Sequence, residues 1–236
     1  MRAKKLFLAF NFLLVLCAIA VSISVGASQI DGLVTALLHP SANNAATEIL
    51  WQIRIPRIAT ALIVGAALGV AGAIAQGATS NPLAEPSILG SSAGAALAVV
   101  IGVLTNLVTI GSVSAMAIAT IGALAATLLT FRFALRNQRV SSFNLIIIGL
   151  SLSATISALV GILTSAITRA DARSISFWNF GSLALTNTSD ILPLLLFTLI
   201  GIVIAIFISP KLDLLSLGDL TARHLGVDRA EFDSIR

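Results

Sequence analysis

Apolar runs of roughly twenty residues alternate with short polar stretches along this chain, and the charged residues are confined to those stretches. A helix of that length crosses a bilayer core roughly 30 Å thick. Charged residues make up 10% of the 236 residues and the mean hydropathy is +1.03, whereas a soluble domain carries roughly 25% charged residues. The alternating pattern of a transmembrane barrel is absent. The sequence therefore predicts an all-α polytopic membrane protein.

The basic residues predict how the spans are oriented. The first apolar run is longer than the 7–15-residue core of a signal peptide, so we expect it to be kept as a span. With the N-terminus inside, ten Lys and Arg residues fall in inside stretches and four in outside stretches, as the positive-inside rule requires. Those four go against the rule: Arg54, Arg57, Arg169 and Arg173. Hydropathy predicts six spans, at about 6–27, 58–78, 87–105, 109–131, 143–166 and 190–209.

Small residues recur at every fourth position on both sides of a polar break at Ser80–Pro86. Such stripes let helix backbones approach each other closely inside a membrane. Pro82 and Pro86 forbid a continuous helix through the break. The residues alone leave it open whether the break is an ordinary inside turn or the wall of a pathway. The stripes are Ala61, Gly65, Gly69, Ala73 and Gly77 before the break, and Gly90, Gly94, Ala98 and Gly102 after it.

Several helix ends carry local signals. Ala45 to Ile53 is compatible with a short interfacial helix, Pro56 with the start of the second span, and Ser87 with the N-cap of the third. Ser216 and Asp219 form a capping box, which predicts a short amphipathic helix at about 216–227 on the inside. This helix either lies flat on the lipid or is presented to a cytoplasmic partner. The fifth span is rich in Ser and Thr, whose hydroxyls bond between helices or face a wet cavity.

The sequence offers little chemistry for an enzyme. No ionisable residue lies clearly within a span, so no proton relay or buried ion site is predicted. No lysine follows a glycine, so the chain has no Walker A loop. Cys17 and two histidines give no zinc or haem-attachment pattern. We therefore expect a transport component rather than an enzyme, with no metal site. Its basicity is explained by topology, so we expect no nucleic-acid partner.

Five blocks then occur in order: RIPR, GAALGVAGAIAQ, NPLAEPSILGSSAGA, FWNFGSL and LSLGDLTARHLGV. With them the chain resembles the FecCD-type permease subunits of ABC importers for iron–siderophore, haem and vitamin B12. The resemblance covers residues 1–236 as a single transmembrane permease domain. It implies a fold of about ten spans of roughly twenty residues each. Because the match stops at Ile235-Arg236, about where a next span should begin, we expect that the remaining spans are missing through truncation or because the gene is a fragment.

The resemblance implies a permease subunit that moves an iron–siderophore, or haem or cobalamin, across the cytoplasmic (inner) membrane of a prokaryote. Such subunits work as a homodimer or with a related permease. Cytoplasmic ATP-binding subunits use the ATP, and this chain binds no cofactor of its own. An extracytoplasmic substrate-binding protein delivers the ligand. The alternatives are a secondary transporter, whose mark would be an intramembrane Asp, Glu or His, and a non-functional fragment of the permease.

Three groups of residues match functional positions of that family. The outside arginines match those that receive acidic residues of the binding protein, and a guanidinium suits paired recognition of a carboxylate. The polar break matches the inside gate, which favours the pathway interpretation. The groups are Arg54 and Arg57 for docking; Asn81, Pro82, Leu83, Ser141 and Ser142 for the gate; and Gly218, Asp219, Ala222, Leu225 and Gly226 for the helix that couples to the ATPase.

Overall fold

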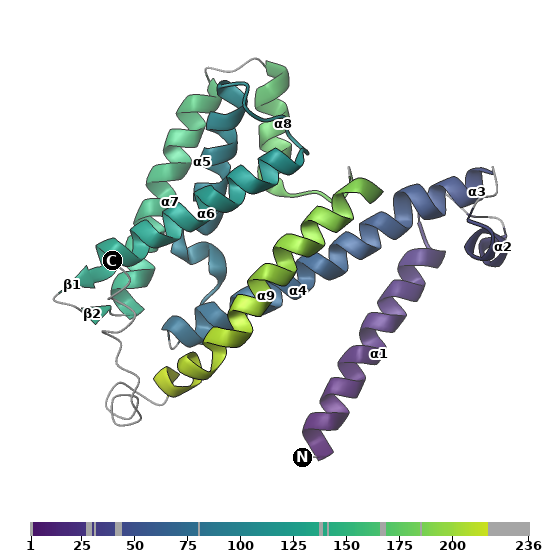
Figure 1. The fold of residues 1–236 in the computed structure, drawn as a ribbon, viewed down its shortest axis with the longest axis horizontal. Helices are drawn as coiled ribbons and strands as arrows, with labels where there is room; N and C mark the ends of the chain where they lie inside the picture. The colour runs from purple at the N-terminus through teal and green to yellow at the C-terminus, as the bar shows by residue number, and fades with distance from the viewer. Residues whose placement is uncertain are drawn as a thin grey trace. The chain divides into compact units, whose positions relative to one another are not determined.

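The computed structural model describes residues 2–26, 30, 32–40, 44–79, 81–136, 139–140, 142–165, 169–184 and 186–216. This part of the chain is nearly all helical (Figure 1), and five of its helices are long and apolar enough to cross a membrane. The chain divides into two compact units, one of Met1–Gly65 with Leu183–Thr198 and one of Ala66–Ser182 with Leu199–Arg236. The coupling helix predicted at about 216–227 lies outside the described residues except for Ser216, as do Gly218, Asp219, Ala222, Leu225 and Gly226.

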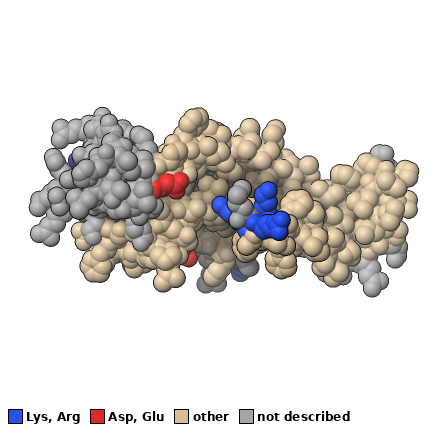
Figure 2. Space-filling view, turned by 90° about the horizontal axis from the view of Figure 1, so that it is seen from below, with Lys and Arg blue, Asp and Glu red and all other residues tan. Residues whose placement is uncertain are grey.

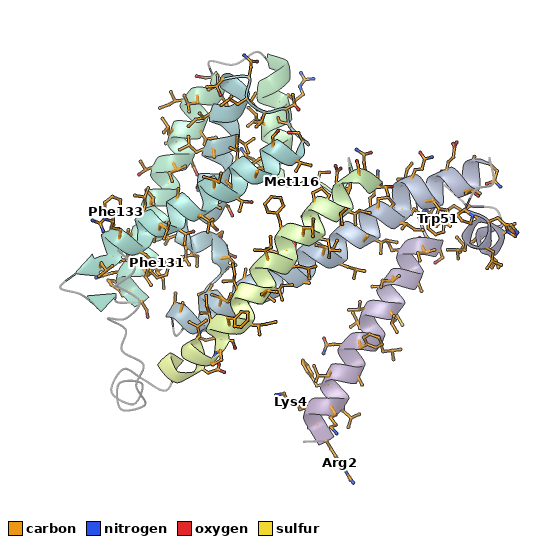
Figure 3. All side chains as sticks on the ribbon, in the orientation of Figure 1. Arg2, Lys4, Trp51, Met116, Phe131 and Phe133 are labelled. Atoms are coloured by element: carbon orange, nitrogen blue, oxygen red, sulfur yellow. The ribbon has the colours of Figure 1, made fainter. Side chains whose placement is uncertain are left out.

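The first unit contains α1 (Arg2–Ser24) and α2 (Leu33–Leu38). A longer helical run follows, made of α3 (Ala45–Glu48), the π-helical segment η1 (Ile49–Arg54) and α4 (Ile55–Thr79), which continues into the second unit. Asn44 caps this run, because its side chain accepts a 2.8 Å hydrogen bond from the Thr47 amide. Trp51, labelled in Figure 3, donates its indole N–H to the Ala36 carbonyl at 3.0 Å. The indole thereby ties η1 to α2.

Two predictions at the start of this run are wrong. Residues 45–53 do not form a separate interfacial helix, and Pro56 does not begin the second span, because the helical run already starts at Ala45. In a regular α-helix the proline ring would meet the carbonyl four residues earlier. Here the Ile55 amide bonds to Leu50, five residues back. The wider π-turn relieves the contact with the ring, so the helix passes through the proline.

The second unit is built on three helices that lie side by side: α5 (Ser91–Leu104), α6 (Val113–Ala134) and α7 (Ser142–Ser165) (Figure 1). α8 (Arg169–Phe180) contacts α7. The short strands β1 (Leu135–Arg136) and β2 (Arg139–Val140) pair antiparallel between α6 and α7. Apolar side chains from α5, α6, α7 and α8 form one buried cluster, which therefore joins all four helices. Its members are Ala96, Val100, Ala126, Ile156, Val160 and Ile175.

The last described helix, α9 (Thr188–Ser216), runs through Pro210 and belongs to both units in turn. Its start is capped by Asp190, whose carboxylate accepts a 3.0 Å hydrogen bond from the Asn187 amide. The apolar part of α9 that could cross a membrane is Thr188–Pro210. The sequence placed this span at about 190–209, so its prediction is confirmed within two residues at the N-terminal end.

The third predicted span is shorter than expected. The sequence placed it at about 87–105, but α5 has only 14 residues and is about 21 Å long at 1.5 Å per residue. Pro86–Leu89 forms a 3-10 turn, η2, and Gly90 then takes a φ of 86°. Because a left-handed φ favours glycine, the chain can change direction here at little cost. Gly90 is thus the N-cap of α5, and the prediction that Ser87 fills that role is wrong.

Glycines let α5, α6 and α7 approach each other within backbone contact. A Cβ added at Gly94 would overlap the Gly122 carbonyl, and one added at Gly122 would overlap the Gly94 carbonyl. A Cβ at Gly149 of α7 would overlap the Ile88 carbonyl of η2. The small-residue stripe after the break is therefore confirmed as a packing face. The stripe before it stays a prediction, because a Cβ at Gly65 or Gly69 meets no described atom within 4 Å.

This contact predicts opposite effects for two glycine substitutions. In Gly94→Ala the new methyl group must push α5 from α6, which costs about 1–3 kcal/mol as overpacking. In Gly69→Ala, α4 gains roughly 1 kcal/mol of helix propensity without a clash. Thermal unfolding in detergent should show a lower midpoint for Gly94→Ala and an equal or higher one for Gly69→Ala. Equal midpoints for wild type and Gly94→Ala would contradict the close crossing.

Candidate functional site

The polar break between α4 and η2 is an ordered turn. The Asn81 side-chain oxygen accepts a hydrogen bond from the Leu83 amide at 3.0 Å, and its carbonyl accepts one from the Ala84 amide at 3.1 Å. The Asn81 amide itself donates to the Gln76 carbonyl at 3.2 Å. One asparagine therefore closes the end of α4 and the turn after it, as Asx turns do.

The turn exposes the apolar side chain of Leu83, while the backbone around it is held by hydrogen bonds. Leu83 is 85% exposed, although it is a large apolar residue, whereas the neighbouring Ala84 is only 4% exposed. On the far side of the turn Ser87 donates to the Glu85 carboxylate, and Ser91 donates to the Pro86 carbonyl at 3.1 Å. These bonds fix both ends of the segment. Leu83 is thus held out from the packed unit and remains available for contact.

The backbone after the turn is tied to two neighbouring helices. Thr130 of α6 is fully buried and donates its hydroxyl to the Leu89 carbonyl at 2.9 Å. The Ser153 hydroxyl of α7 is buried without a hydrogen-bond partner in the described structure, and a Cβ on Gly90 would lie 3.7 Å from it. Sequence analysis missed Thr130, because a single threonine in the last turns of an apolar span carries no pattern that marks a tertiary bond.

The two serines predicted for the gate lie where α7 starts. Ser142 is the first residue of α7 and is half-buried, and Ser141 lies outside the described residues. The tight approach of α7 to η2 is at Gly149, seven residues beyond Ser142 and thus about two helical turns away. The structure therefore brings α7 against η2, directly after the break, at Gly149, and the gate role of Ser141 and Ser142 stays a prediction.

Other hydroxyls of α7 serve their own helix. Ser151 donates to the Ile147 carbonyl and Thr155 to the Ser151 carbonyl, each at 2.8 Å. Thr164 likewise donates to the Val160 carbonyl at 2.8 Å. Each bond returns to the residue four positions earlier, as Ser and Thr in apolar helices do. These three hydroxyls therefore donate within α7 rather than to another helix, and the prediction that hydroxyls of this span face a wet cavity stays a prediction.

The two outside arginines, three residues apart in the sequence, occupy different environments. Arg54, at the end of η1, is only 8% exposed, and its Nη1 donates to the Ile23 carbonyl in the last turn of α1. Arg57, in the first turn of α4, is exposed, and its Nη2 donates to the Ala184 carbonyl at 2.8 Å. Among the described residues no carboxylate pairs with Arg57. It therefore offers a charged guanidinium to a partner, whereas Arg54 is turned into the protein.

The described surface carries few charges. Figure 2 shows a face that consists mostly of residues other than Lys, Arg, Asp and Glu, with charged side chains at only a few places. Within the described ranges no three His, Cys, Asp or Glu residues are grouped so that they could hold a metal ion. The exposed Leu83 turn and the exposed Arg57 are two features of the described chain that a partner can contact.

The sequence comparisons point to one family. The model of the FecCD transport family matches residues 12–234. The molybdate import system permease protein MolB of Haemophilus influenzae is 34% identical over 184 residues, which are 78% of this chain and 54% of that protein. The ferric enterobactin transport system permease protein FepG of Escherichia coli is 36% identical over 199 residues, or 82% of this chain and 58% of that protein.

A relative that aligns over more of the chain is the hemin transport system permease protein HmuU of Yersinia pestis. It is 34% identical over 226 residues, which are 94% of this chain and 67% of that protein. The chain thus spans between about half and two thirds of the length of these relatives. A solved structure, an inward-facing conformation of a metal-chelate type ABC transporter, superposes with a TM-score of 0.74 at 30% identity. The match covers 97% of this chain and 70% of that chain.

The turn at the break gives a prediction that is independent of transport. Asn81→Ala removes the acceptor of the Leu83 amide, so hydrogen exchange at Leu83 should become about three- to tenfold faster, as the loss of about 1 kcal/mol implies. Asn81→Asp keeps an acceptor oxygen and should exchange nearly like the wild type. Hydrogen–deuterium exchange read by mass spectrometry on the peptide around residues 81–85 measures both. Equal exchange in Asn81→Ala and wild type would show that the side chain does not hold the turn.

Proposed function

Because this chain belongs to the FecCD transport family, we propose that it acts as a membrane-spanning permease subunit of an ATP-driven importer. The family match across residues 12–234 is the observation that carries this proposal. The fold agrees with it, since a metal-chelate type ABC transporter superposes on 97% of the chain. A secondary transporter is not favoured, because the relatives are permease proteins of import systems of this family. We treat residues 1–236 as one permease domain.

The proposed substrate is a metal chelate, with an iron–siderophore as first choice and haem or cobalamin as alternatives. Relatives named for ferric enterobactin, hemin and vitamin B12 support this class. A relative named for molybdate widens the range to a small oxyanion. A bulky chelate suits a wide, weakly polar pathway lined by small and hydroxyl side chains. The permease need perform no chemistry on such a ligand.

The proposed orientation puts the N-terminus inside, in the cytoplasmic membrane of a prokaryote. Arg2, Lys4 and Lys5 are exposed at the start of α1, where Figure 3 labels Arg2 and Lys4. Arg132 is exposed in the last turn of α6. Basic residues at these helix ends favour a cytoplasmic location. The Arg57 end of α4 then faces outward and the Leu83 turn faces inward.

The proposed mechanism is alternating access driven by partners. Cytoplasmic ATP-binding subunits hydrolyse ATP, and the segment at about 216–227 transmits their motion to the spans. A second permease, identical or related, completes the pathway. Leu83 lies on the inward turn and is exposed, as a gate residue that meets its counterpart in the second permease would be. The proposed gate is Asn81, Pro82 and Leu83 with Ser141 and Ser142, and the proposed coupling residues are Gly218, Asp219, Ala222, Leu225 and Gly226.

ATP hydrolysis in a reconstituted complex tests the function. This chain is placed in proteoliposomes with its ATP-binding subunits and cognate binding protein, and ferric siderophore, haem, cobalamin and molybdate are supplied in turn. We expect one ligand to stimulate hydrolysis and to accumulate inside. Gly218→Trp should lower the ligand moved per ATP hydrolysed, because a bulky side chain does not fit a docking groove, whereas Gly69→Ala should not. An ATP hydrolysis rate that is unchanged by every ligand and by the binding protein would overturn the proposal.

Docking of the binding protein is tested at Arg57. Arg57→Glu places a negative charge opposite acidic residues of the partner, so the affinity should fall about tenfold or more. Arg132→Glu is the matched control, because Arg132 is also exposed but lies at the proposed inner end of α6. Biolayer interferometry on detergent-purified complexes measures both affinities. An unchanged affinity in Arg57→Glu would rule out this docking residue.

A further inference from the structure

We propose that Leu212 is a positioning residue, which passes the motion of the coupling segment (about 216–227) to the Leu83 turn through its contact with Gly77. The contact joins the ends of two helices that are far apart in the sequence. A Cβ added at Gly77 of α4 would lie 3.7 Å from the Leu212 Cβ of α9. Both residues belong to the second compact unit, and Figure 1 shows the ends of α4 and α9 beside each other.

The contact is selective among the glycines of α4. A Cβ added at Gly65, Gly69 or Gly72 meets no described atom within 4 Å outside the backbone of its own helix. At Gly77 the Leu212 side chain is within that distance. A residue without a side chain lets a neighbouring helix come close to the backbone. Gly77 is therefore the glycine of α4 at which the described structure brings another helix against it.

Gly77 lies next to the bonds that hold the Leu83 turn. The Asn81 amide donates to the Gln76 carbonyl at 3.2 Å, and the Asn81 side chain accepts from the Leu83 amide at 3.0 Å. Thr79, the last residue of α4, is 2% exposed and donates its hydroxyl to a carbonyl of its own helix at 2.7 Å. The end of α4 is thus bonded to the helix before it and to the turn after it. A displacement at Gly77 therefore reaches Leu83.

The other side of the contact leads to the coupling segment. Leu212 lies in the last two turns of α9, which ends at Ser216, where the proposed coupling segment begins. Pro210 precedes Leu212 by two residues, and a proline within a helix removes a backbone hydrogen bond and favours a bend. The part of α9 after Pro210 can therefore tilt as a short lever. Leu212 then bears on α4, and the coupling segment lies at the free end of the lever.

The direction of this signal rests on the proposed function, whereas the contact itself does not. Leu212 needs volume and no polar group for this role, so methionine should replace it and alanine should not. An alanine at Gly77 should be tolerated, because 3.7 Å is an ordinary van der Waals separation for its Cβ. A leucine at Gly77 should push the lever away from α4.

Disulfide formation tests the contact without any partner protein. A disulfide joins Cβ atoms about 3.5–4.5 Å apart. In a Cys17→Ser background, which removes the only cysteine of the chain, Gly77→Cys with Leu212→Cys should therefore crosslink rapidly under mild oxidation in detergent. Gly69→Cys with Leu212→Cys is the matched control, because it moves the thiol roughly 12 Å along α4. Mass spectrometry of the digested chain measures both crosslinks. No crosslink at Gly77, or equal crosslinking in the two pairs, would overturn the contact.

Hydrogen exchange tests whether the contact acts on the turn. Closing the disulfide between positions 77 and 212 should slow exchange in the peptide around residues 81–85 relative to the reduced form, since the end of α4 then moves less. Leu212→Ala should speed this exchange, and Leu212→Met should leave it near the wild type. Exchange that is the same in the oxidised and reduced forms would show that the contact does not reach the turn, and would overturn the positioning role.

The reconstituted transporter gives the last readout. Leu212→Ala should keep ATP hydrolysis but lower the ligand moved per ATP at least about fivefold, the low end of a typical coupling between two sites. Gly77→Leu should do the same from the other side of the contact, and it decides the matter where Leu212→Ala does not fold. Gly77→Ala and Leu212→Met should keep the wild-type ratio. A wild-type ratio in Leu212→Ala or in Gly77→Leu would overturn the positioning role. Wild-type hydrolysis that is unchanged by ligand and binding protein would refute the proposed function alone, since the crosslink and the exchange still decide the contact.

Discussion

A chain in lipid must satisfy its backbone hydrogen bonds within the protein, and the interruptions of its helices follow from this constraint. Before Pro56 the Ile55 amide bonds five residues back, to Leu50, so the helix widens rather than ends. After α4 the side chain and carbonyl of Asn81 replace the lost helical acceptors. At the end of η2 the free carbonyl of Leu89 receives the Thr130 hydroxyl. Each interruption of the helix is thus closed by a bond that the local sequence or a neighbouring helix supplies.

The short helix α5 is held in place by close packing against its neighbours α6 and α7. With 14 residues it is about 21 Å long, less than the bilayer core of roughly 30 Å. Gly94 meets Gly122, and Gly149 meets the Ile88 carbonyl, so α6 and α7 contact both α5 and the turn that precedes it. Because these glycines have no Cβ, the helix backbones touch directly. The direct contact brings many atom pairs within van der Waals distance. The turn that follows the break is therefore held against α6 and α7.

Hydropathy was sufficient to predict the helical class and the long spans, because burial in lipid depends on composition and length alone. It overestimated the length of α5, since residues 87–89 belong to the 3-10 turn and Gly90 has a left-handed conformation, so that the helix begins only at Ser91. The prolines predicted the break but not the Thr130 bond, because that bond depends on which helices meet. The Asn81 turn is local, but two prolines mark where a helix stops without showing which side chain closes the turn. The Ser and Thr residues of the fifth span suggested hydroxyls that bond between helices or face a wet cavity, whereas three of these hydroxyls in α7 bond within their own helix.

The arginine pair shows why a charge pattern identifies candidates without assigning their roles. The positive-inside rule marks Arg54 and Arg57 together, because it counts charges near helix ends and does not see what surrounds them. Two different partners can stabilise the charge of an arginine near a helix end: a carboxylate of another protein, or the C-terminal carbonyls of a helix in the same chain. Spacing by three residues on a helix would place both on one face. Arg54, however, ends the π-turn and is buried against α1, while Arg57 starts the regular helix and is exposed. The π-turn next to Pro56 thus lies between a buried environment for Arg54 and an exposed environment for Arg57.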